Sequence, residues 1–236
     1  MNIAIVGATG NVGRKILEVL ELKKFPINQL YLVASAKSAG KKIIFNGKDY
    51  EVYNLETFDF SKVQISFFSA GGKISEQYAV KAAKYSTVID NSSYYRMDPD
   101  VPLIVPEVNS QDLKNYKKKN IIANSNCSVI PLVVALKPLH DLYNIKRIVA
   151  STYQSVSGAG KLPMDELLSQ TKDFFENKEL SSKYFTKQIA FNAIPHIDSF
   201  LDDGYTKEEL KMHDEVKKIL DSKIKITSTS VRIPVL

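Results

Sequence analysis

The first residues of the chain combine a short apolar strand with three regularly spaced glycines, and this restricts the fold more than any other feature. Residues 2–6 read Asn-Ile-Ala-Ile-Val, and Gly7, Gly10 and Gly13 follow at the start of a helix expected over residues 12–22. Glycines permit a tight turn and a close approach of the backbone to a pyrophosphate, which binds at the N-terminus of a helix. The strand before and the helix after these glycines favour a dinucleotide-binding unit.

Strands followed by polar or glycine-rich turns recur through the first half of the chain. Further buried strands are expected at residues 30–34, 64–68 and 87–90. A second glycine-rich turn at residues 69–72 precedes a helix expected over residues 74–84. Asn46-Gly47 predicts a hairpin, which we interpret as an antiparallel excursion. The alternation indicates an α/β fold with a doubly wound, Rossmann-like parallel sheet.

The residues after the second strand bear on which dinucleotide the unit binds. A site specific for NAD carries Asp or Glu there, to bind the 2′-hydroxyl of the ribose. This chain instead has Ser35, Lys37, Ser38 and Lys41. Hydroxyl and ammonium groups favour a 2′-phosphate, so we expect NADP. The alternative is that Lys37 and Lys41 are solvated loop residues.

Cys127 is the only cysteine of the chain, and it follows a predicted buried strand. A helix is expected to begin at or just after it, with Pro131 in the first turn and a disturbance at Pro138. The N–H groups and the dipole at a helix N-terminus favour a thiolate and can receive an oxyanion. These features predict a nucleophile, and the alternative is an inert, buried packing residue.

Polar residues elsewhere supply further candidates. Arg96 lies in the loop after the strand at residues 87–90, where it either clamps a phosphate or carboxylate or pairs with Asp98. Gln154 ends a strand expected from residue 148. His196, in an apolar segment, is expected to be a hydrogen-bonded structural histidine rather than a catalytic one.

A capping box of Thr206 and Glu209 predicts a helix over residues 207–220. Glu208 and Lys211 project from one face of that helix, either as an ordinary surface pair or as groups that hold an amino group and an anion. Apolar residues between Met164 and Phe175 recur on one face of another helix. Because monomers seldom expose so large an apolar patch, we expect this stripe to join two subunits.

Composition narrows the classes of function. The net charge of +6 is dispersed and is not interleaved with aromatic residues, which argues against nucleic-acid binding. No apolar run approaches a membrane span, and no signal peptide is visible. A single cysteine suits a reducing compartment, so we expect a cytoplasmic protein. We expect no metal site.

Taken together, these segments resemble the aspartate-β-semialdehyde dehydrogenase family. The matching segments are Gly7–Gly13, Phe68–Gly72, Asp90–Ser93, Arg96–Leu103, Val105–Asn109, Asn126–Ser128, Ser151–Gln154, Ser157–Gly160, Phe191-Asn192, Ile194–Asp198, Glu208-Glu209, Lys211 and Val231-Arg232. The resemblance covers nearly the whole chain. It implies an NADP-binding Rossmann-like domain at residues 1–126 and an α+β catalytic and dimerisation domain at residues 127–236.

The resemblance implies NADPH-dependent reductive dephosphorylation of L-aspartyl-4-phosphate to aspartate semialdehyde, on the route to lysine, threonine, methionine and diaminopimelate. It makes Cys127 the nucleophile that forms an acyl thioester, while Gln154 orients the substrate. It assigns Arg96, Asn126 and Lys211 to the phosphate, Glu208 to the substrate amino group, and Arg232 to the substrate carboxylate. The implied NADP contacts are Gly7, Thr9, Gly10, Asn11, Val12, Lys37, Ser38, Ser69, Gly71, Ser157 and Gly158. The implied assembly is a homodimer.

Two departures from the family pattern affect these expectations. Ser125 stands where the family usually has proline, which loosens the turn before Cys127. The sequence also stops at Leu236, before the family's catalytic histidine and its closing segment, and none of His140, His196 and His213 lies in that motif. We therefore expect little turnover from these residues alone, since proton transfer typically contributes ~10²–10⁴-fold.

Two other functions compete with this one. N-acetyl-γ-glutamyl-phosphate reductase shares the acyl-phosphate chemistry and the cysteine, although Glu208, Lys211 and residues 151–154 fit the aspartyl enzyme better. The second competitor is a catalytically silent NADP-binding protein.

Overall fold

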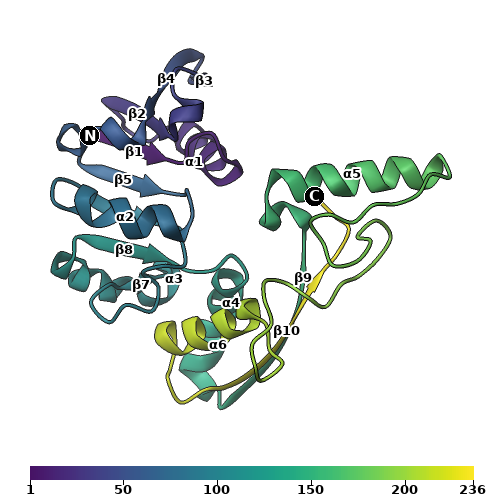
Figure 1. Ribbon diagram of the computed structural model, residues 1–236. Coiled ribbons are helices and arrows are strands. Elements are labelled where there is room, and N and C mark those ends of the chain that lie inside the picture. The colour runs from purple at the N-terminus through teal and green to yellow at the C-terminus, as the bar shows by residue number, and fades with distance from the viewer. The chain divides into compact units, whose positions relative to one another are not determined.

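A computed structural model describes residues 1–236, which form two compact units (Figure 1). The first unit comprises Met1–Lys137 together with Lys218–Leu220, and the second comprises Pro138–Lys217 together with Asp221–Leu236. This is a division by packing. The functional boundary at residues 126 and 127 that the sequence suggests stays a prediction.

An eight-stranded sheet organises the first unit, with the strand order β3-β4-β2-β1-β5-β6-β8-β7. The strands are β1 (Asn2–Val6), β2 (Gln29–Ala34), β3 (Lys42–Phe45), β4 (Lys48–Asn54), β5 (Ile65–Phe68), β6 (Thr87–Asp90), β7 (Leu103–Ile104) and β8 (Ile121–Asn124). Every neighbouring pair is parallel except β3 with β4. The helices are α1 (Asn11–Leu22), α2 (Gly72–Ala83), α3 (Pro106–Asn109) and the first part of α4 (Val129–Tyr143). The predicted doubly wound sheet is confirmed.

The central strand β1 is buried on both faces of the sheet, which matches its apolar sequence. Ile3, Ala4, Ile5 and Val6 have no exposed surface, as befits a strand buried on both sides. The hairpin at Asn46-Gly47 is also confirmed, with positive φ at both turn residues. The sequence suggested only an antiparallel excursion, but the second strand of the hairpin, β4, also pairs in parallel with β2 and so joins the hairpin to the main sheet.

The expectation that Pro138 disturbs its helix is wrong, because α4 continues to Tyr143. The fixed φ of proline is compatible with a helix, and the ring removes a single backbone donor. The turn after the proline is intact, since the N–H of Asn144 donates to the carbonyl of His140 at 2.8 Å. Pro138 is also the residue at which the second unit begins.

The second unit contains a two-stranded parallel sheet of β9 (Arg147–Gln154) and β10 (Lys225–Arg232), together with helices α5 (Lys161–Phe175) and α6 (Lys207–Ile219). The strands pair along their whole length, from Lys225 opposite Arg147 to Arg232 opposite Gln154. The predicted capping box of α6 is confirmed, since Glu209 accepts from the N–H of Thr206 at 2.7 Å and returns its own N–H to the Thr206 hydroxyl.

Two buried side chains of α5 hold the irregular chain that follows it. The Gln170 amide donates to the carbonyl of Ser181, and its oxygen accepts the N–H groups of Ile189 at 2.9 Å and Ala190 at 3.1 Å. Glu166 accepts the N–H groups of Lys183 and Tyr184, both at 2.7 Å. These bonds replace the secondary structure that this segment lacks.

Changing Gly13 to alanine tests the packing of the first turn. The added Cβ would lie 2.3 Å from the carbonyl oxygen of Gly7, which is backbone and cannot move aside. We expect a loss of about 1–3 kcal/mol in the free energy of unfolding, measured by urea denaturation. Gly72→Ala is the matched control, because a Cβ there meets nothing closer than 3.8 Å. Equal stability of the two variants would contradict this account.

Gln170→Ala tests the anchoring of the irregular segment. It leaves the N–H groups of Ile189 and Ala190 without their acceptor, and both residues are fully buried. Each orphaned donor costs about 1–3 kcal/mol, so the thermal unfolding midpoint should fall by several degrees. Ser169→Ala, which removes an exposed hydroxyl on the same helix, should change it little. A similar shift in both variants would refute the anchoring role.

Candidate active site

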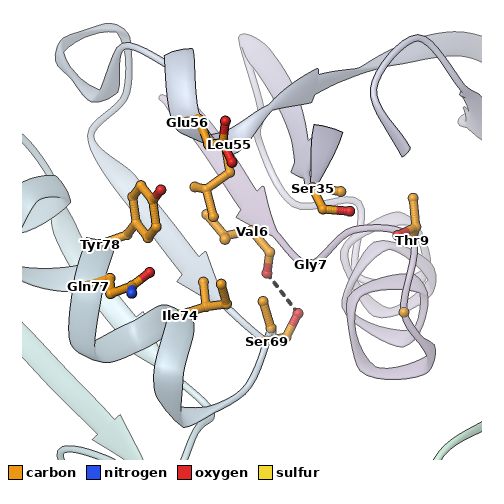
Figure 2. A pocket seen from close by; sticks show the side chains of 13 residues that line it. Val6, Gly7, Thr9, Ser35, Leu55, Glu56, Ser69, Ile74, Gln77 and Tyr78 are labelled. Atoms are coloured by element: carbon orange, nitrogen blue, oxygen red, sulfur yellow. Dashed lines mark hydrogen bonds between the residues drawn. The ribbon is translucent and has the colours of Figure 1, made fainter. Parts of the chain in front are cut away.

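A pocket of about 450 Å³ opens beside the carboxyl ends of β1 and β5, where the strand order of the sheet reverses (Figure 2). Doubly wound sheets bind ligands at such switch points. The pocket is lined by Val6, Gly7, Thr9, Gly10, Ala34, Ser35, Leu55, Glu56, Ser69, Ala70, Ile74, Gln77 and Tyr78. Four of the predicted cofactor residues, Gly7, Thr9, Gly10 and Ser69, are therefore brought together here.

Glycine is required where the two strand ends meet. Gly7 has a φ of +89°, and a Cβ there would lie 2.9 Å from the carbonyl carbon and oxygen of Ser69. The Ser69 hydroxyl donates to the carbonyl of Val6 at 3.0 Å, across the same junction (Figure 2). The wall of the pocket at this point is therefore backbone, which suits the close approach of a pyrophosphate.

Other predicted cofactor residues are not part of the pocket wall. Asn11 and Val12 begin α1, and Gly71 immediately precedes α2. Lys37 and Ser38 lie in a 3₁₀ turn after β2, where Lys37 is exposed. Ser157 and Gly158 belong to a short 3₁₀ turn of the second unit.

The pocket also contains residues that the sequence did not indicate. Leu55 and Glu56 reach it because β4 lies beside β2 in the sheet. Ile74, Gln77 and Tyr78 come from one side of α2 (Figure 2). Their spacing of three and four residues on a predicted helix was the available signal for the latter group.

Cys127 is exposed in the turn between β8 and α4, so the alternative of a buried packing residue is wrong. Asn126 shapes this turn. Its side-chain oxygen accepts the N–H of Ser128 at 2.8 Å, and its carbonyl accepts the N–H groups of Val129 and Ile130 at 3.0 and 3.1 Å. These donors are therefore already used, which argues against the expectation that they receive an oxyanion. Asn126 holds the turn in which the sulfur is presented.

Arg96 is buried, and its guanidinium is oriented by main-chain carbonyls of neighbouring strand ends. Its Nε donates to the carbonyl of Asn124 at 2.9 Å, and its Nη2 donates to the carbonyl of Asn91 at 3.0 Å. Asn124 lies three residues before Cys127, so the structure brings Arg96 to the same end of β8 as the cysteine turn.

Two lysines fix the loop that carries Arg96. Lys218, which packs with the first unit, donates to the carbonyls of Arg96, Asp98 and Val101 at 2.7, 2.8 and 3.0 Å. Asp98 forms an ion pair with Lys119 at 2.6 Å. Partial burial opposes the charge on Asp98, but the hydrogen bonds from Lys119 and from the N–H of Asp100 lower the pKa of its carboxyl.

In the second unit, four polar side chains form a connected cluster that includes three predicted or implied site residues. Gln154 donates to Glu208 Oε1 at 3.1 Å, and Lys211 donates to Glu208 Oε2 at 3.1 Å and to Asp198 Oδ2 at 2.8 Å. Burial disfavours the charge on Lys211, yet its hydrogen bond to Asp198 and the charge of Glu208 raise the pKa of the ammonium. Burial acts against ionisation of Asp198 as well, but the bond from Lys211 lowers the pKa of that carboxyl. Asp198 was not predicted.

Arg232 is held at the end of β10. Its Nη1 donates to the carbonyl of Ser155 at 2.5 Å, and its backbone forms an antiparallel bridge with Ile194. A Cβ on Gly158 would lie 3.3 Å from this guanidinium nitrogen, so glycine there leaves room for the arginine. His196 is hydrogen-bonded to Thr186 at 3.4 Å and stacked on Phe200, as expected, and its structural rather than catalytic role stays a prediction.

The structure offers no group of three His, Cys, Asp or Glu side chains arranged to hold a metal ion. None of its helices combines the length and the apolar character needed to cross a bilayer.

Two family models match the chain. One is described as "Semialdehyde dehydrogenase, NAD binding domain" and covers residues 2–116, and the other is described as "Semialdehyde dehydrogenase, dimerisation domain" and covers residues 136–236. The Aquifex aeolicus aspartate-semialdehyde dehydrogenase is 56% identical over 237 residues, which span 99% of this chain and 70% of that protein.

Solved structures agree with these matches. The crystal structure of aspartate semialdehyde dehydrogenase II from Vibrio cholerae complexed with ASA has a TM-score of 0.98 and 51% identity, and the match covers 100% of this chain and 70% of that one. The Candida albicans enzyme with NADP has a TM-score of 0.68 and 25% identity over 100% and 68% of the two chains. The chain therefore belongs to the aspartate-semialdehyde dehydrogenase family.

Proposed function

We propose that this protein catalyses the NADPH-dependent reductive dephosphorylation of L-aspartyl-4-phosphate to L-aspartate 4-semialdehyde, a step toward lysine, threonine, methionine and diaminopimelate. The observation that carries the proposal is the exposed Cys127, presented by the Asn126 turn in the same unit as the glycine-lined pocket. Family membership selects the aspartyl substrate over N-acetyl-γ-glutamyl phosphate and over a silent binding protein.

Cys127 performs the covalent step. Its sulfur attacks the C4 carbonyl of the aspartyl phosphate, a C–S bond forms, and the C–O bond to the phosphate breaks. Phosphate leaves with its electron pair, and a thioester remains on the protein. The thioester carbon is then reduced, and departure of the Cys127 sulfur releases the aldehyde.

Arg96 is suited to bind the departing phosphate. Its guanidinium carries a permanent positive charge and is held by two carbonyls, while Lys218 fixes the loop on which it lies. Asn126 is assigned to the phosphate with it, in addition to shaping the cysteine turn.

Three residues of the second unit are assigned to the rest of the substrate. Arg232, fixed by the Ser155 carbonyl, binds the α-carboxylate as a planar fork. Glu208 binds the amino group, and Gln154, which donates to Glu208, orients the substrate. Lys211 is the remaining cation assigned to the phosphate.

NADP fits the pocket because its wall at Gly7 and Ser69 is bare backbone at the switch point of the sheet. When bound, NADPH supplies the hydride for reduction of the thioester. Ser35 and the nearby Lys37 favour the 2′-phosphate, whereas Glu56 adds one carboxylate to the wall. Ser157 and Gly158 are assigned as further cofactor contacts, and a reaction that needs a reduced thiol suits the cytoplasm.

The second unit is also assigned to a homodimer. Leu168, Phe174 and Phe175 of the apolar stripe on α5 are exposed, whereas Leu167 packs in the core of the unit. Phe174 and Phe175 pack against the exposed ring of Phe191. An exposed apolar surface of this kind, on a segment matched by a dimerisation-domain model, supports contact with a second copy.

Cys127→Ser tests the covalent mechanism. A hydroxyl is a far weaker nucleophile than a thiolate, so in the protein extended through the family's histidine motif phosphate-dependent reduction of NADP by aspartate semialdehyde should fall by at least about 10³-fold. NADPH affinity, measured by fluorescence titration, should stay the same. A rate within tenfold of the wild type would exclude Cys127 as the nucleophile.

Ser35→Asp tests the choice of cofactor. A carboxylate at the end of β2 repels a 2′-phosphate and accepts a hydrogen bond from a 2′-hydroxyl. We expect NADPH to bind at least about tenfold more weakly while NADH binding is retained or improved, as one repulsive contact removes roughly 1.4 kcal/mol. Ser35→Asn, which is the same size without the charge, serves as the control. If both variants lose NADPH equally, charge at Ser35 does not set the preference.

A further inference from the structure

The pocket beside β1 and β5 has two chemically different sides. Figure 2 shows Gly7 and Thr9 on one side of it and Tyr78 on the other. The first side is the glycine turn, which suits a pyrophosphate. The second side is aliphatic and aromatic, because Leu55, Ile74 and Tyr78 line it. Apolar walls that include an aromatic ring suit a flat heteroaromatic base better than a sugar or a phosphate.

Glu56 is the only charged residue among those that line this pocket. Its position is fixed by the fold. Asn54 lies opposite Ala34 in the parallel register of β4 and β2, so the residues that follow Asn54 come to lie beside Ser35 on the pocket wall. The side chain of Asn54 then accepts the N–H of Glu56 at 3.2 Å and so holds the first turn after β4. The strand register and this hydrogen bond therefore place Glu56 at the pocket.

A carboxylate at this place needs an explanation, because the proposed cofactor is an anion. Like charges repel, so Glu56 weakens binding of a dinucleotide unless the dinucleotide donates a hydrogen bond to it. The adenosine part of NADP has two such donors, the free hydroxyl of the ribose and the exocyclic amino group of the adenine ring. Only the amino group belongs to the ring that suits the apolar walls at Leu55 and Tyr78. Glu56 is exposed, so its carboxylate is accessible to a ligand.

We propose that Glu56 is a specificity-determining residue that accepts a hydrogen bond from the exocyclic amino group of adenine. This rests on the proposed function, which supplies NADP as the cofactor. An ionised carboxylate only accepts hydrogen bonds. A base that carries the amino group satisfies it, whereas a base without that group leaves the carboxylate desolvated and unpaired, and a site of this kind rejects such an analogue. Glu56 thus selects the base of the cofactor, while Ser35 and Lys37 favour its 2′-phosphate.

Fluorescence titration with two reduced cofactors tests this assignment without requiring turnover. One is NADPH, and the other is its purine-riboside analogue, in which hydrogen replaces the exocyclic amino group. The wild type should bind NADPH about tenfold more tightly than the analogue, the difference expected for one charge-assisted hydrogen bond at an accessible site. Glu56→Leu should bind the two equally, because it has no acceptor. Glu56→Gln, which keeps an uncharged acceptor, should retain part of the preference.

Glu51→Leu is the matched control. Glu51 is an exposed glutamate of β4 outside the pocket, so its replacement removes the same charge from the same hairpin. Its preference for NADPH should equal that of the wild type. An unchanged preference in Glu56→Leu overturns the proposal. So does an equal change in affinity for both cofactors, which would mean that Glu56 contacts the ribose or only repels the phosphates.

The proposed function fails in a different way. A protein extended through the family's histidine motif that shows the predicted preferences, yet does not reduce NADP with aspartate semialdehyde and phosphate, supports the role of Glu56 and refutes the proposed reaction. A wild-type protein that binds neither cofactor overturns the role of Glu56 and removes NADP from the proposed function.

Discussion

The direct contact of backbone with backbone around Gly7 is the constraint on which the first unit depends. A Cβ at Gly7 would strike the main chain of Ser69, and one at Gly13 would strike the carbonyl of Gly7. The turn after β1 can therefore close against both the end of β5 and the first turn of α1 only because these residues lack side chains. This closure leaves a pocket whose wall is main chain at the point where the sheet reverses its order.

The residues assigned to the reaction are held in place by hydrogen bonds and ion pairs with neighbouring side chains. Asn126 caps the start of α4 with both its side chain and its carbonyl, and leaves Cys127 exposed. The ammonium group of Lys218 donates hydrogen bonds to three carbonyls of the loop that contains Arg96. In the second unit, Asp198 holds Lys211 in a comparable way. Cys127, Arg96 and Lys211 are thus each positioned by a neighbouring side chain or by the loop that such a side chain fixes.

Structural features that depend on a few consecutive residues could be predicted from the sequence. Features that depend on the order of strands in the sheet or on a single side-chain contact could not. The glycine turns, the Asn46-Gly47 hairpin and the Thr206 capping box follow from backbone rules and are confirmed. Glu56 reaches the pocket only because β4 returns beside β2, which no local pattern reveals. The oxyanion role expected for the N–H groups after Cys127 conflicts with the structure because Asn126 takes them. The contact of Asp198 with Lys211 could not be predicted, because it depends on the left-handed backbone conformation of Asp198.

The central claim is that one sulfur carries the acyl group, and the mass of the protein tests it most directly. The protein is mixed with NADP and aspartate semialdehyde in the absence of phosphate, so that the thioester has no acceptor other than water. Because the chain has a single cysteine, the account predicts one added aspartyl group on the peptide that contains Cys127, removed when phosphate is supplied. Reduction of NADP with no adduct, or with the adduct on another residue, would contradict it.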